Sequence, residues 1–418
     1  MPAPPTANPL RRELGLGDAV VVGLGAMLGA GVFAVFAPAA AAAGTGLLLA
    51  LAVAALVAYC NATSSAELAA VHPAAGGTYV YGRRQLGPLW GFVAGWGFVV
   101  GKTASCAAMA LTAGAYAWPD HPRLAAAAAA AAMTAVNYRG VAKTAALTRL
   151  LVAVTLLVLG LVLVGCLGGG GADPDRLSPF GGQGLHGVLQ AAGLLFFAFA
   201  GYARIATLGE EVRDPGRTIR RAVPIALLVV VVTYGLVGLA VLLVLGADAT
   251  ARSAAPLQAA VAAGSLHGLA PLVRVGAVTA SLGVLLSAMA GVGRTTLAMA
   301  RDAELPSWLA AVHPRFAVPH RAELVLGAVV VVVVSLTDLR GAIGFSSTGV
   351  LVYYAIANAS AWTLPGASRR WRRPVAVLGL LGCTVLVLSL PLSSVLVGLG
   401  VLAVGLAART GARAMRRR

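Results

Sequence analysis

Charged residues are scarce in this sequence, and the shortage excludes most classes of soluble protein. They make up 11% of the 418 residues, whereas soluble domains carry about 25%. Hydrophobic residues make up 59%, and the mean hydropathy is +0.88. A soluble enzyme is therefore excluded, and the composition indicates a protein embedded in a membrane.

Cysteine and histidine are also few, which argues against a metal centre or a covalent catalyst. The 4 cysteines lie in or beside apolar runs, and none is spaced from another as zinc ligands are. The 6 histidines fall near predicted loops, so no buried Ser–His pair is expected within a span. We expect buried free thiols, no metal site, no cofactor and no enzymatic activity.

Long apolar runs are abundant instead. A helix needs about 20 apolar residues to cross the bilayer core, and the strands of a membrane barrel would be alternating segments of about half that length. The sequence therefore predicts an all-α polytopic membrane protein with about twelve transmembrane helices. The expected spans are 18–38, 44–70, 87–116, 123–138, 146–168, 185–209, 222–246, 269–299, 322–338, 342–364, 374–390 and 392–409.

Acidic residues are outnumbered by basic ones, 14 to 31, which gives a net charge of +17. With the N-terminus inside and the spans alternating, most basic residues fall on the cytoplasmic side, as the positive-inside rule requires. Because the arginines are spread over several loops and both tails, their charge does not indicate nucleic-acid binding. We expect a multi-pass protein of the cell membrane with both termini in the cytoplasm. Once the other basic residues are assigned to one side or the other, two of the 31, Lys102 and Arg204, remain within spans.

Glycine is concentrated in the first span, where four glycines stand between Val22 and Phe33. Each costs roughly 1 kcal/mol relative to alanine in a helix. One interpretation is close helix packing through small residues. The other is a helix interrupted at Gly29–Gly31, whose free backbone groups line a cavity. The sixth span carries a similar small pair, Ala200–Gly201, and interruptions at matching positions of two five-helix halves are typical of a transporter binding site.

Several motifs, in order along the chain, resemble those of the amino acid–polyamine–organocation permeases. The stretch from Gly25 to Phe33 resembles the first-helix motif of that family, and the stretch from Phe196 to Pro215 resembles its sixth helix and the loop that follows. The resemblance implies a LeuT-like core of two inverted five-helix repeats with discontinuous helices 1 and 6, plus two C-terminal helices. Further matches are Ala75–Tyr81, Asn137–Val141, Ala300–Asp302 and Leu305–Pro306.

The resemblance also implies a division of the chain and a function. The function is secondary active transport of amino acids or related amines by alternating access, coupled to protons or to exchange. The expected parts are a cytoplasmic N-terminal tail at 1–17, the first repeat at 18–168, the second repeat at 185–364, helices 11 and 12 at 374–409 and a basic cytoplasmic tail at 410–418.

A substrate site is implied where the two discontinuous helices meet. Backbone amides of the first break would hold the substrate carboxylate, and carbonyls of the sixth-helix break would take its amine. Aromatic side chains beside the second break would close over the substrate, with core packing as the alternative for them. The expected substrate-binding residues are Met27, Gly29, Ala30 and Gly31 on helix 1, and Phe197, Phe199, Ala200, Gly201 and Tyr202 on helix 6.

The sequence departs from the family pattern at two positions that bear on substrate and coupling. Ala203 stands where many members carry a glutamate, which disfavours a cationic substrate. Thr155 stands where several proton-coupled members carry a lysine. Its hydroxyl oxygen, together with that of Ser287, offers ligands for a sodium ion instead.

Lys102 lies in the middle of the third predicted span. Because a charge at the bilayer centre costs a few kcal/mol, we expect it to titrate during the cycle and to replace the missing lysine. The alternative is a structural lysine that snorkels or pairs with a carbonyl or carboxylate. We expect an amino acid transporter coupled more readily to H⁺ than to Na⁺, and its other partner is the lipid bilayer. A sodium-coupled transporter of the same fold and a non-transporting amino acid sensor are the alternatives.

Overall fold

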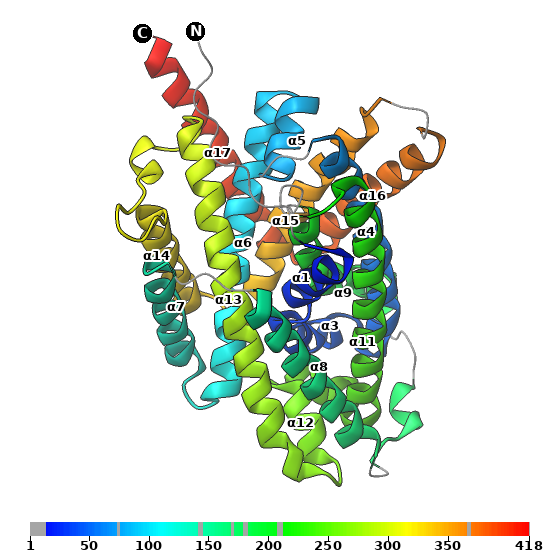
Figure 1. Ribbon diagram of the computed structural model, residues 1–418. Coiled ribbons are helices and arrows are strands. Elements are labelled where there is room, and N and C mark those ends of the chain that lie inside the picture. Colours follow the sequence, from blue (N-terminus) through cyan, green and yellow to red (C-terminus); the bar gives the residue numbers. More distant parts are fainter. Residues whose placement is uncertain are drawn as a thin grey trace.

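The computed structural model describes residues 14–72, 76–140, 145–168, 171–178, 183–206, 212–365 and 369–417. Almost all of this described chain is helical, and its only β contact is an isolated bridge between Leu14 and Val212. The all-α prediction is therefore confirmed. Figure 1 shows the helices gathered into one bundle, with α5 (Thr78–Gln85) at one end and α12 (Pro256–Ala263) at the other.

Each of the twelve predicted spans coincides with a helix or with a run of short helices. Ten segments of the described chain are long and apolar enough to cross a membrane. Two further helices, α7 and α14, have 17 residues each and pack against each other. The bounds are α1 Leu16–Met27, α2 Ala30–Ala34, α3 Phe36–Ala43, α4 Leu47–Val71, α6 Pro88–Ala117, α7 Pro122–Tyr138, α8 Ala145–Leu167, α9 Gly184–Phe199, η3 Ala200–Tyr202, α10 Ala203–Ala206, α11 Pro215–Arg252, α13 Ala270–Arg301, α14 His320–Leu336, α15 Leu339–Trp362, α16 Arg369–Ser389 and α17 Leu392–Arg417.

Helix ends differ from the predicted spans where the chain continues beyond the apolar run. The helix α11 begins at Pro215, directly after Asp214, and continues past a bend at Gly246, where φ is +73°. The helix α17 runs through the basic segment 410–417, which the sequence had placed in a tail. These extensions are polar, so hydropathy alone did not include them.

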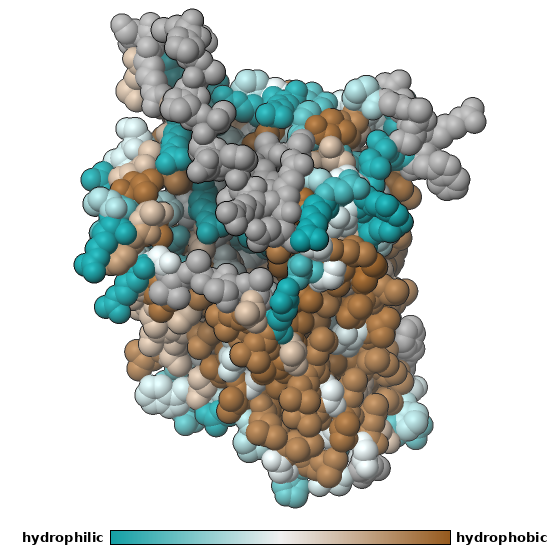
Figure 2. All heavy atoms as spheres, in the orientation of Figure 1, coloured by the Kyte–Doolittle hydropathy of each residue, from teal (hydrophilic) through white to brown (hydrophobic). Residues whose placement is uncertain are grey.

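Large apolar side chains cover the outside of the bundle. Leu157, Val275, Leu336 and Leu388 are between 64% and 80% exposed. Figure 2 shows a continuous hydrophobic surface over the lower part of the molecule, with hydrophilic residues gathered above it. Apolar exposure on this scale suits a lipid environment, because soluble monomers expose only limited apolar patches. The multi-pass membrane prediction is confirmed, and the cytoplasmic orientation of the termini stays a prediction.

Ion pairs with the buried Glu304 hold α17 against the rest of the bundle. Glu304, in the loop after α13, receives hydrogen bonds from Arg409 Nε at 2.6 Å and Nη2 at 3.1 Å, and one from Arg413 at 2.8 Å. The side chains of Glu304 and Arg409 are 2% and 5% exposed. Arg409 also donates to the carbonyl of Pro88 at 3.0 Å and lies over the ring of Phe92. The cluster joins α17 to α6 and to the loop after α13.

A second charged cluster joins α5 to the end of α13. The hydroxyl of Tyr79 donates to Asp302 at 2.6 Å, and Arg83 donates to both Asp302 and Tyr79, at 2.9 and 3.0 Å. Burial, and then the hydrogen bond to Asp302, raise the pKa of Tyr79 above its ordinary value, so this phenol stays protonated. The loop helix α5 is thereby tied to the end of a long bundle helix.

Three more ion pairs lie on the side that the alternation predicts as cytoplasmic. Glu67, near the end of α4, pairs with Arg220 of α11 at 3.0 Å and with Arg372 of α16 at 2.9 Å. Asp18 of α1 pairs with Arg149 of α8. The start of the first helix is thus held to its neighbours by charge, and the bridge between Leu14 and Val212 adds a backbone contact.

Candidate functional site

The first helix is interrupted at Leu28 and Gly29. The helix α1 ends at Met27, Leu28 has ψ +54°, and Gly29 has φ −119° and ψ −134°, outside the helical region. The predicted interruption is confirmed, although it begins one residue earlier than expected. Ala30 and Gly31 lie in the first turn of α2. The N-cap residue of this helix is Gly29, which has no side chain to cap the leading amides. The leading amides of such a turn have no helical acceptor.

The sixth helix narrows at the predicted place rather than unwinding. The helix α9 ends at Phe199, and Ala200–Tyr202 form the 3₁₀ turn η3 before α10 begins. A short 3₁₀ stretch inside a helix has poorer hydrogen-bond geometry and often marks a functional hinge. The α-helical pattern of helix 6 is therefore interrupted by a 3₁₀ turn at the expected position, without an unwound segment.

The two interruptions lie directly against each other. A Cβ atom on Gly201 would stand 2.3 Å from the carbonyl oxygen of Ala26, and one on Gly31 would stand 2.9 Å from Cα of Ala198. No side chain fits at such distances, so only glycine lets these backbones approach. Close packing and helix interruption, which the sequence left as alternatives, thus occur together.

A buried tyrosine of α11 joins the two interrupted helices. The hydroxyl of Tyr234 donates to the carbonyl of Met27 at 2.7 Å and lies 3.2 Å from the carbonyl of Ala198. The side chain is 0% exposed. The amide of Gly29 also donates to Met27 O, at 2.8 Å. This hydroxyl therefore serves carbonyl groups of both helices at the point where they meet.

The carbonyl of Ala200 is approached by two donors from other helices. The hydroxyl of Tyr354, on α15, donates to it at 3.1 Å, and Nζ of Lys102, on α6, makes a long contact at 3.5 Å. The lysine is partly buried, and none of the ion pairs formed by described residues includes it. The ammonium group therefore lies at the carbonyl where the resemblance places the amine of a substrate.

Aromatic side chains surround this meeting point. The rings of Phe199 and Tyr234 have centroids 5.4 Å apart, and those of Tyr202 and Tyr354 are 4.9 Å apart. Phe197 is buried as well, with 7% exposure. These contacts agree with core packing, and a role in closing over a substrate stays a prediction.

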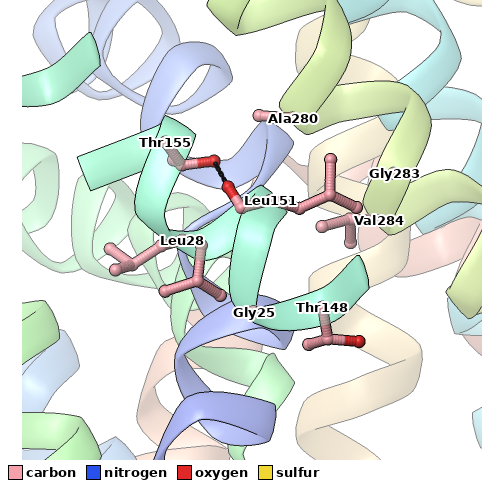
Figure 3. Close-up of a pocket in the computed structure, with 9 residues that line it drawn as sticks. Gly25, Leu28, Thr148, Leu151, Thr155, Ala280, Gly283 and Val284 are labelled. Atoms are coloured by element: carbon pink, nitrogen blue, oxygen red, sulfur yellow. Dashed lines mark hydrogen bonds between the residues drawn. The ribbon is translucent and has the colours of Figure 1, made fainter. Parts of the chain in front are cut away.

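A small cavity lies beside the first interruption, and Thr155 lines it. The cavity has a volume of about 20 Å³, which has room for a water molecule. Figure 3 shows that its walls come from α1, α8 and α13. Thr155 donates its hydroxyl hydrogen to Leu151 O at 2.8 Å, which leaves its oxygen lone pairs for another partner. The lining residues are Gly25, Leu28, Thr148, Leu151, Val152, Thr155, Ala280, Gly283 and Val284.

Ser287 does not join Thr155 at this cavity. It is exposed, and its hydroxyl donates to Gly283 O within α13. The positions of α13 that do line the cavity are Ala280, Gly283 and Val284. The structure therefore brings one of the two predicted oxygen ligands to the cavity and leaves the other on the surface.

Sequence reasoning missed Tyr234 and Tyr354. Both interrupt otherwise apolar runs, and a buried tyrosine hydroxyl generally needs a hydrogen-bond partner. That signal was available at both positions. Which carbonyl each hydroxyl meets depends on how α11 and α15 pack, and the sequence does not contain that information.

Comparison with known proteins places the chain in a family. The amino acid permease family matches residues 14–407. An uncharacterized transporter of Mycobacterium tuberculosis is 63% identical over 98% of this chain and 93% of its own length. A branched-chain amino acid permease of Bacillus subtilis is 26% identical over 91% of this chain and 88% of its own. A methylthioribose transporter of the same bacterium is 28% identical over 82% of this chain and 77% of its own length.

These findings agree with the sequence resemblance and with the helical architecture. The match covers nearly the whole chain, including both interrupted helices, and its relatives are transporters rather than enzymes. The chain therefore belongs to the amino acid permease family, within the amino acid–polyamine–organocation superfamily.

Proposed function

We propose that this permease carries neutral amino acids across the cell membrane by alternating access, in a cycle coupled to protons. The proposal rests on the meeting of the two interrupted helices, where backbone amides of one helix and a backbone carbonyl of the other offer opposite polarity. Amides in the first turn of α2 suit a carboxylate, and the Ala200 carbonyl suits an ammonium group. An amino acid carries both groups on one carbon.

Two features support a neutral substrate. Ala203 offers no carboxylate for a second positive charge, and Lys102 places a positive charge beside Ala200 O. Whether protonated or neutral, Lys102 offers no negative charge to a basic side chain of a substrate. The name of the branched-chain permease of Bacillus subtilis agrees with a neutral, apolar substrate.

Proton coupling rests on the position of Lys102. Its ammonium group and the substrate amine would share the carbonyl of Ala200. Two unit charges about 4 Å apart repel by about 4 kcal/mol at an effective dielectric constant of 20. Binding of a substrate amine therefore favours loss of the lysine proton. Sodium coupling through the Thr155 cavity is the second candidate, because the threonine oxygen faces a space bounded by the first interruption.

Counterflow in proteoliposomes tests the substrate claim. Vesicles preloaded with unlabelled L-leucine should accumulate labelled L-leucine, and L-arginine inside should support far less exchange. A sensor on the same fold would bind L-leucine without exchange, and that result would refute transport. Replacing external Na⁺ by K⁺ should leave the rate unchanged, whereas a strict requirement for Na⁺ would favour the sodium alternative.

The variant Lys102→Met tests the coupling claim. We expect it to keep L-leucine counterflow but to lose the alkaline limb of the pH profile of uptake, since no ammonium group remains to titrate. The neighbouring variant Thr103→Ala is the control, because Thr103 donates to Val99 O within α6. A wild-type alkaline limb in Lys102→Met would exclude this lysine from coupling.

A further inference from the structure

A buried carboxyl group lies in α14, outside the meeting point of helices 1 and 6. Glu323 is 2% exposed and stands one turn from the start of that helix. Its Oε2 atom is buried and has no hydrogen-bond partner among the described residues. A carboxylate in such a place is costly unless it is paired or protonated.

No counter-ion among the described residues is in contact with Glu323. None of the ion pairs between described residues includes this carboxyl. The backbone of α13 leaves room for it at Gly293, where a Cβ atom would stand 2.4 Å from Oε1. The titratable and charged groups near it are Arg294 of α13, Cys106 of α6, and His320 and Arg321 in the first turn of α14 itself. The ring of His320 in turn contacts Tyr138 of α7.

The carboxyl group also lies near the face of α6 that carries Lys102. Cys106 stands one helical turn after Lys102 on α6, and its buried side chain lies near both Lys102 and Glu323. The α6, α13 and α14 helices pack together around these groups. A change in the protonation of Glu323 can therefore affect the packing of α6, whose Lys102 contacts the carbonyl of Ala200 at the proposed substrate site.

We propose that Glu323 is a proton-binding site of the transport cycle. The carboxyl group holds a proton in the packed arrangement described here and releases it when movement of α14 against α13 admits water or brings Arg294 close. One proton is bound and released, no bond between heavy atoms changes, and water is the proton acceptor. The inference rests on the proposed transport function and adds a second titrating group to it.

The test is the acidic limb of L-leucine uptake, measured with proteoliposomes of the full-length protein. Wild-type uptake should change about fivefold between about pH 5 and pH 7, the range in which the proposed site would bind and release its proton. Glu323→Gln should keep counterflow within about twofold of wild type, because glutamine resembles the protonated acid, and should lose the acidic limb. Ser335→Ala, on the exposed face of the same helix, is the matched control.

A second variant guards against misfolding of the first. Gly293→Ala keeps the acid but displaces its carboxyl group, so it should move the midpoint of the acidic limb without removing it. An acidic limb identical to wild type in both variants overturns the proposal, as does a wild-type protein with no acidic limb. If wild-type protein shows no L-leucine counterflow at all, the proposed function fails instead, so the two failures are distinguishable.

Discussion

The hydroxyl of Tyr234 offers the sharpest test of how the two interrupted helices are held together. Tyr234→Phe removes one donor that serves Met27 O at 2.7 Å and Ala198 O at 3.2 Å. Met27 O keeps the amide of Gly29, and the ring keeps its contact with Phe199. The loss is therefore close to one ordinary hydrogen bond, about 1 kcal/mol, and it falls on the contact between the two helices.

The expected result is a local functional defect in a folded protein. A change of about 1 kcal/mol corresponds to roughly a fivefold fall in L-leucine exchange, measured by counterflow in proteoliposomes at equal protein content. Tyr59→Phe is the matched control, because Tyr59 is 48% exposed on α4. Wild-type exchange in Tyr234→Phe would refute the role of this hydroxyl. An equal fall in both variants would show that the effect is not specific to the bridge.

Two further predictions concern glycine contacts and ion pairs. Gly201→Ala should abolish counterflow and destabilise the protein by about 1–3 kcal/mol in a thermal-shift assay, because its Cβ would meet Ala26 O at 2.3 Å. Gly235→Ala should be neutral or stabilising in the same assay, because a Cβ atom there would have nothing within 4 Å. Equal effects of the two variants would refute the close-contact argument. Glu304→Gln should lower the free energy of unfolding by about 3–5 kcal/mol, because it leaves the buried Arg409 without its counter-ion. Asp302→Asn should lower it by under about 1 kcal/mol, because the side chains of Arg83 and Asp302 are 38% and 45% exposed. Similar melting shifts in these two variants would contradict the difference in burial.

The fold could be predicted from the sequence because its strongest signals are local. Apolar runs located the helices that correspond to the twelve predicted spans. A glycine cluster located the break in the first of them, and the Ala200–Gly201 pair located the turn in the sixth. The exact form of each interruption was not predictable. The first break begins at Leu28, one residue before the glycine. The sixth helix tightens into a 3₁₀ turn at Ala200–Tyr202, where Gly201 packs closely on Ala26.

The candidate site was less predictable, because it depends on which faces of distant helices meet. Lys102 was recognised from its charge, but its contact with Ala200 O required the packing of α6 on the sixth helix. Ser287 was expected beside Thr155, yet the rotation of α13 turns it outward and places Gly283 and Val284 at the cavity. Glu323 lies at the start of a predicted span, and a charge near the end of a membrane helix does not by itself indicate a functional site.

A cryo-electron microscopy structure of the protein with bound L-leucine would test the proposed substrate site directly. We expect density for the amino acid between the two interrupted helices, with its carboxylate at the first turn of α2 and its ammonium group at the carbonyl of Ala200. Density for the ligand elsewhere in the bundle, with Lys102 still at Ala200 O, would contradict it.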